Sequence, residues 1–117
     1  MRIVWESDAE VATSSVAYTE LRSAIGAASR DQRVPRRHVA RLVQQLEDAW
    51  TRIVTFDVDE QLARSGGEVA DRHALEALDA IHLATALRLA DPELTFVSWD
   101  ARLRDAASDV GLAVVPA

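Results

Sequence analysis

The sequence contains no cysteine, no lysine and no long apolar run, and only 5% of its residues are aromatic. The absence of cysteine excludes disulfide bonds, thiolate metal sites and cysteine nucleophiles. No apolar stretch approaches the length of about 20 residues that a membrane-spanning helix needs, and the N-terminus has no signal-like apolar segment. We therefore expect a cytoplasmic protein that makes no membrane contact.

The charge balance is acidic. All 13 basic residues are arginine, against 19 acidic residues, and the net charge is −6. This balance argues against broad electrostatic binding of nucleic acid, although an acidic metal pocket could still meet phosphate through the metal, helped by local arginines. The length of 117 residues, 49% of them apolar, suits one domain with one core.

Short strand-like segments alternate with helix-like segments along the chain. The helical pattern is clearest over residues 39–50, where apolar residues recur every three or four positions. Another helix should follow a cap at Ser14 or Ser15, and the remaining helices are expected over residues 58–73, 77–90 and 100–109. The strands are expected over residues 10–14, 53–56, 94–99 and 113–115. This alternation predicts an α/β fold with a mostly parallel sheet covered by helices.

Three acids occupy comparable places in these elements. Asp100 directly follows the third predicted strand, Asp79 falls in or near the first turn of its helix, and Glu20 falls about one turn into the first helix. The carboxyl ends of parallel strands, and the helix starts after them, form the usual ligand crevice of such folds. Because Mg²⁺ takes oxygen ligands, we expect the three carboxylates to converge on one acidic pocket.

Each acid taken alone has a simpler explanation. The helix dipole favours an acid in a first turn, and Glu20 could be a solvated surface residue. Asp79, however, belongs to an otherwise apolar helix, where a charge is costly unless it is paired or bound to metal. His82 in the same helix is interpreted as a packed, hydrogen-bonded side chain rather than a ligand.

Two further residues are candidates for contact with a substrate. Ser98 could hydrogen-bond a carboxylate or a metal-bound water, and Arg102, together with Arg104, could meet phosphate groups. The alternatives are a polar strand residue and solvated helix charges.

These residues resemble the PIN domain, and most closely the VapC-type toxins of bacterial toxin–antitoxin pairs. The resemblance covers residues 10–112, and its most specific block is Leu-Asp-Ala-Ile-His-Leu-Ala-Thr-Ala at residues 78–86. The other two blocks are Thr13-Ser14 followed by Glu20-Leu21, and Ser-Trp-Asp-Ala-Arg-Leu at residues 98–103.

The resemblance implies a small three-layer α/β domain that binds Mg²⁺ or Mn²⁺ and cleaves RNA. By matching motif positions, Glu20, Asp79 and Asp100 take the roles of metal-binding, catalytic acids. The family also implies frequent homodimers and inhibition by a cognate VapB-like antitoxin.

One feature of the family is absent. The family normally opens with a strand that ends in Asp-Thr or Asp-Ser and lies in the middle of the sheet, in the order 3-2-1-4-5. Residues 1–8 instead look like the helix that precedes the second strand. We therefore expect a single PIN-like domain over residues 1–117 that is incomplete at its N-terminus, through a misassigned start or a real loss. The strands at 10–14 and 94–99 should then pair directly.

Two functional hypotheses follow. The first is a metal-dependent endoribonuclease toxin that hydrolyses RNA phosphodiester bonds with a metal-activated water. The second is a catalytically impaired PIN-like fragment that only binds an antitoxin or another partner.

Overall fold

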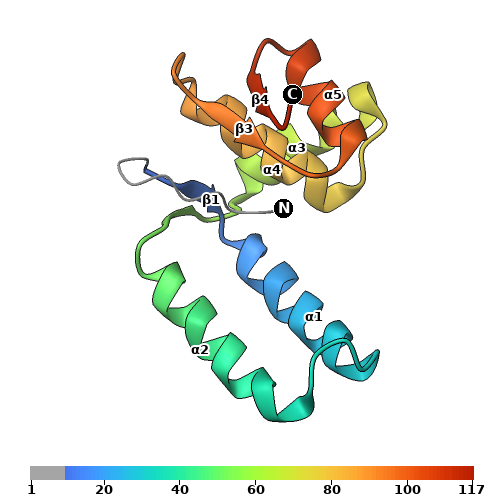
Figure 1. Ribbon diagram of the computed structural model, residues 1–117. Helices are drawn as coiled ribbons and strands as arrows, with labels where there is room; N and C mark the ends of the chain where they lie inside the picture. The colour runs from blue at the N-terminus through green and yellow to red at the C-terminus, as the bar shows by residue number, and fades with distance from the viewer. Residues whose placement is uncertain (1–9) are drawn as a thin grey trace.

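The strands and helices occur in the predicted order. The structure, a computed structural model, describes residues 10–117 (Figure 1). Its elements are β1 (Ala12–Ser14), α1 (Val16–Arg30), the short 3₁₀ helix η1 (Arg36–His38), α2 (Val39–Trp50), β2 (Val54–Phe56), α3 (Glu60–His73), α4 (Ala77–Leu89), β3 (Thr95–Val97), α5 (Ala101–Asp109) and β4 (Ala113–Val115). The expected α/β class is confirmed. The helix expected over residues 1–8 lies outside the described residues.

The strands form two separate pairs. Strand β1 pairs in parallel with β2, with Thr13 opposite Thr55, and β3 pairs in parallel with β4, with Phe96 opposite Val114. The parallel character of the pairing is confirmed. The expectation that the strands at 10–14 and 94–99 pair directly is wrong, because β1 and β3 belong to different sheets.

The two strand pairs pack against different helices. Strand β1 packs against α4, whereas β3 packs against α5 and inserts Phe96 into the core. Each strand has only three residues. A direct β1–β3 ladder would therefore add few hydrogen bonds, which individually contribute only about 1 kcal/mol net, against the loss of buried apolar contacts.

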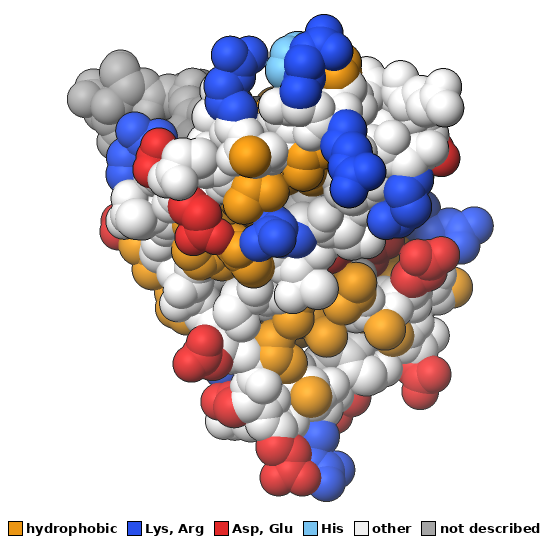
Figure 2. Space-filling view, turned by 90° about the horizontal axis from the view of Figure 1, so that it is seen from below, with side chains coloured by type: hydrophobic (Ala, Val, Ile, Leu, Met, Phe, Trp, Pro, Cys, Tyr) orange, Lys and Arg blue, Asp and Glu red, His pale blue; other side chains and the backbone are white. Residues whose placement is uncertain are grey.

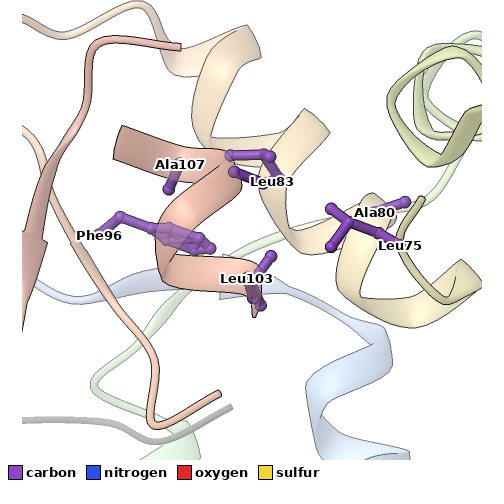
Figure 3. Close-up of a cluster of buried hydrophobic side chains, with 7 residues drawn as sticks. Leu75, Ala80, Leu83, Phe96, Leu103 and Ala107 are labelled. Carbon is purple, nitrogen blue, oxygen red and sulfur yellow. The ribbon is translucent and has the colours of Figure 1, made fainter. Parts of the chain in front are cut away.

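The main core lies between α4, α5 and β3 (Figure 3). Leu83 of α4 and Leu103 of α5 are almost completely buried in it, and Phe96 reaches it from β3. The remaining members are small or lie at the edge: Leu75, Ala80, Ala106 and Ala107. Because alanines alternate with the larger residues, the two helices can approach each other closely over the strand.

Helices α1 and α2 form an antiparallel arm that projects from this body (Figure 1). The rings of Tyr18 and Trp50 meet edge to face at a centroid distance of 5.5 Å near the base of the arm. The Tyr18 hydroxyl is also hydrogen-bonded to Glu47 of α2. No helix within residues 10–117 combines the length and apolarity that crossing a membrane would need.

Candidate active site

Asp79 lies in the first turn of α4, where it is partly buried. Burial raises the pKa of its carboxyl above the ordinary value of 3.8, and the negative charges of Asp100, Glu76 and Glu20 raise it further, while His82 acts in the opposite direction. A neighbouring charge shifts a pKa only when it is close. Asp79 therefore lies within electrostatic reach of both other predicted site acids.

Asp100 occupies the N-cap position of α5. Its Oδ1 accepts a hydrogen bond of 3.0 Å from the backbone N–H of Leu103, which satisfies one of the free donors at the helix start. Its own backbone N–H donates to Ser98 Oγ at 3.1 Å. These two bonds fix Asp100 at the start of α5, separated from the end of β3 by Ser98 and Trp99.

Ser98 and the two nearby arginines differ in their exposure to solvent: Ser98 is buried, Arg104 is half-buried and Arg102 is exposed. Ser98 is only 3% exposed, and its carbonyl oxygen accepts a hydrogen bond of 2.9 Å from Arg104 Nη1. Arg102, in the first turn of α5, is exposed to solvent. Ser98 and Arg104 thus support the loop that carries Asp100, whereas Arg102 is available to an approaching ligand.

Glu20 reaches α4 from the second turn of α1. Its Oε1 is hydrogen-bonded to Nε2 of His82, a residue 62 positions later in the chain. The Glu20 side chain is 26% exposed and the His82 side chain only 2%. The carboxylate therefore has one oxygen on a buried partner while part of the side chain still faces solvent.

Two observations relate the three acids to the N-terminal half of α4. Glu20 is hydrogen-bonded to His82, which lies three residues after Asp79 on the same face of the helix. The negative charge of Asp100 raises the pKa of Asp79. Within residues 10–117, no three His, Asp or Glu side chains are arranged as a set that could hold a metal ion. The convergence of the acids on a metal site stays a prediction.

Two neighbours of the site were not assigned a role from the sequence. Glu76, at the N-cap position of α4, adds negative charge near Asp79. His82 was interpreted as a packed residue, and it is buried and hydrogen-bonded, but its partner is a predicted site acid. The spacing of three between Asp79 and His82 was the available signal, because it places both side chains on one face of α4.

Parallel strand pairs covered by helices, with Asp79 and Asp100 at the starts of α4 and α5, define a small α/β domain. The PIN domain profile matches residues 1–108, and the chain belongs to the PIN domain family. Ribonuclease VapC45 of Mycobacterium tuberculosis strain CDC 1551 / Oshkosh is 33% identical over 114 residues, which cover 97% of this chain and 79% of that protein. Ribonuclease VapC49 of Mycobacterium tuberculosis strain ATCC 25618 / H37Rv has the same identity and coverage.

Proposed function

We propose that this chain is a Mg²⁺- or Mn²⁺-dependent endoribonuclease, the toxin of a type II toxin–antitoxin pair that acts in the cytoplasm. Its substrate is RNA, its partner is a VapB-like antitoxin, and a second copy of the chain is a further candidate partner. Membership of the PIN domain family and the two relatives named as ribonucleases support this proposal.

The observation that carries the proposal is the environment of Asp79. Partial burial raises the pKa of its carboxyl, and the negative charges of Asp100, Glu76 and Glu20 raise it further. Carboxylates gathered in this way repel one another, and a bound cation relieves that repulsion. Because all three side chains offer oxygen, the donor set fits a hard divalent cation such as Mg²⁺ or Mn²⁺.

Glu20, Asp79 and Asp100 would hold this cation. When bound, it would lower the pKa of a water molecule and stabilise negative charge on the phosphate. Asp100 is oriented for this task by its bonds to Ser98 and Leu103, so its carboxylate needs little rearrangement. Ser98 is buried, which supports a role in orienting Asp100 rather than in touching RNA.

Exposed arginines in two regions of the chain are candidates for contact with the RNA backbone. Arg102 is exposed, two residues after Asp100. The turn between α1 and α2 carries a larger group, which we call the arm cluster: Arg30, Arg33, Arg36, Arg37 and Arg41. All five are exposed, and Asp31 is the only acid among residues 30–41.

Figure 2 views the molecule from the side on which the arm projects. Arginine side chains gather along one part of this face, while acidic side chains are spread over the rest. In a chain of net charge −6, this local concentration of positive charge offers a surface suited to phosphate groups.

The direct test is RNA cleavage by the wild-type chain and by Asp79→Asn and Asp100→Asn, each with Mg²⁺, Mn²⁺ or chelator. Asparagine keeps the size of the side chain and, at position 100, the helix cap, but it removes the charge. We expect cleavage only with added metal and a large loss in both variants. Asp71 is an exposed residue of α3, so Asp71→Asn is the matched control for the loss of one negative charge. Full activity in chelator, or undiminished cleavage by either site variant, would refute the proposal.

A second function, a binding module for an antitoxin or another partner, is favoured by a different observation. No three potential ligands within the described part of the chain are arranged to hold a metal ion, and Glu20 already has a partner in His82. Calorimetric titration with Mn²⁺ separates the two functions. The nuclease requires binding that Asp79→Asn weakens, whereas the binding module predicts no difference between wild type and variant.

A further inference from the structure

His82 is a buried polar side chain in an apolar part of α4. Its neighbours Ala80, Leu83 and Ala84 are all buried core residues. Burying an imidazole is unfavourable unless its nitrogens are hydrogen-bonded. An apolar residue of similar size would fill this position without burying an unpaired nitrogen, so the presence of histidine needs a specific reason.

The two nitrogens of His82 are used differently. Nε2 is hydrogen-bonded to Glu20 Oε1, while the buried Nδ1 has no hydrogen-bond partner among the described residues. A carboxylate can only accept, so Nε2 must carry the proton and donate it. The histidine therefore supplies a hydrogen bond to the Glu20 carboxylate, while its own Nδ1 has no hydrogen-bond partner among the described residues.

The geometry leaves the second oxygen of Glu20 available. Only Oε1 bonds to His82, and the Glu20 side chain keeps 26% of its surface exposed. A glutamate has three side-chain torsions before its carboxylate and loses considerable rotamer freedom when it is fixed. The bond to a buried, immobile ring removes much of that freedom before any ligand arrives.

We propose that His82 is a positioning residue: it fixes the Glu20 carboxylate through Oε1, and Oε2 would then be free to bind a divalent cation together with Asp79 and Asp100. This inference rests on the proposed nuclease function and adds to it a residue that touches neither metal nor RNA. Partners that orient a ligand in this way typically change metal affinity by about 10–100-fold when they are removed.

A purely structural role for His82 makes a different prediction. If the bond only satisfied a buried imidazole, replacing His82 with an apolar residue would change stability and leave metal binding unaltered. If His82 positions Glu20, the apolar variant should fold at least as well, because the buried unpaired Nδ1 is gone, yet bind metal more weakly. In the apolar variant of His82, metal affinity would then fall without a loss of stability.

The experiment measures Mn²⁺ affinity by calorimetry and by electron paramagnetic resonance, together with the melting temperature without metal. The variants are His82→Leu, His82→Gln and His82→Asn. Glutamine carries an N–H donor at a position comparable to Nε2 and should reach Glu20, whereas the shorter asparagine should not. His38→Leu, in the arm, is the matched control for the loss of a histidine.

We expect His82→Leu and His82→Asn to bind Mn²⁺ about tenfold more weakly, and His82→Gln and His38→Leu to bind close to wild type. If His82→Leu fails to fold, the comparison of His82→Asn with His82→Gln decides. Equal Mn²⁺ affinity in these two folded variants, or in wild type and folded His82→Leu, would overturn the positioning role alone. Absence of Mn²⁺ binding by the wild-type chain would overturn the proposed nuclease function and this inference with it.

Discussion

Gly66 of α3 lies directly against Ile81 of α4. A Cβ atom added at Gly66 would be 3.2 Å from Ile81 Cγ1 and 3.6 Å from Ile81 Cα, so only a residue without a side chain fits without adjustment. Ile81 stands between Asp79 and His82 in the sequence. The close approach of α3 therefore helps to fix the position of the helix that carries the candidate active site.

Substitution of Gly66 should consequently destabilise the fold. A leucine at this position would force α3 and α4 apart, and overpacking of this kind typically costs about 1–3 kcal/mol. Gly67 is the matched control, because it lies in the same helix and nothing comes within 4 Å of a Cβ added there. Gly67→Ala should stabilise the protein by about 0.5–1 kcal/mol through helix propensity. Urea denaturation measures both; a stable Gly66→Leu would refute the packing argument.

Asp79 should make stability depend on pH. Because its pKa is raised in the folded protein, the native state holds a proton more tightly than the unfolded state does. Stability must then fall as pH rises from about 3.8 through the folded pKa, and the loss is complete above that value. Asp79→Asn should be more stable than wild type at pH 7 and should lose this advantage near pH 3.

Denaturation curves of wild type and Asp79→Asn across this pH range, without metal, test the expectation. Mg²⁺ should then stabilise wild type more than the variant, since a ligand that binds the native state raises its stability. Asp71→Asn, an exposed residue on α3, controls for the change in net charge. A stability difference between wild type and Asp79→Asn that is the same at pH 3 and pH 7 would contradict the raised pKa.

The arm cluster should strengthen the binding of RNA. Arg36→Gln combined with Arg37→Gln should weaken binding of single-stranded RNA and lower the slope of log affinity against log salt by about 0.7 for each phosphate that the variant no longer neutralises. Helix α1 places Arg30 about 15 Å along its axis from Glu20, so the effect should require an RNA of at least four or five nucleotides.

Fluorescence anisotropy in an Asp79→Asn background, which should prevent cleavage, measures this binding. The matched control is the pair Arg64→Gln and Arg72→Gln on α3, which removes the same charge from another exposed surface. Equal losses of affinity for the two pairs would indicate that only net charge matters, and the arm would then have no specific role.

Substitutions of Arg102 and Arg104 should have different effects, because we expect Arg102 to contact RNA and Arg104 to stabilise the loop that carries Asp100. Arg104→Gln breaks the hydrogen bond to the Ser98 carbonyl and should cost about 1–2 kcal/mol of stability. Arg102→Gln removes an exposed charge, so stability should change by less than about 0.5 kcal/mol while RNA binding weakens. Thermal denaturation and anisotropy report the two effects; a destabilised Arg102→Gln with unchanged RNA binding would reverse the assignment.

The sequence alone was sufficient for features that depend on neighbouring residues. Apolar spacing predicted α2 at residues 39–50, and the acid after the third strand was predicted at a helix start, where Asp100 caps α5. Helix periodicity, capping and strand composition act within one or two turns, so the chain encodes them locally. The three ordered motifs were sufficient to indicate the PIN domain, and the profile match confirmed it.

Only the tertiary structure decided the relationships between distant segments. Glu20 and His82 are 62 residues apart, and no local pattern indicates that they are hydrogen-bonded. Direct pairing of β1 with β3 was expected from the family topology, but the two strands belong to different sheets. Gly66 permits the close approach of Ile81 in the next helix, a contact that no local pattern indicates. Such outcomes depend on how side chains fill the space between elements, and this competition among packing arrangements is settled only when the whole chain has folded.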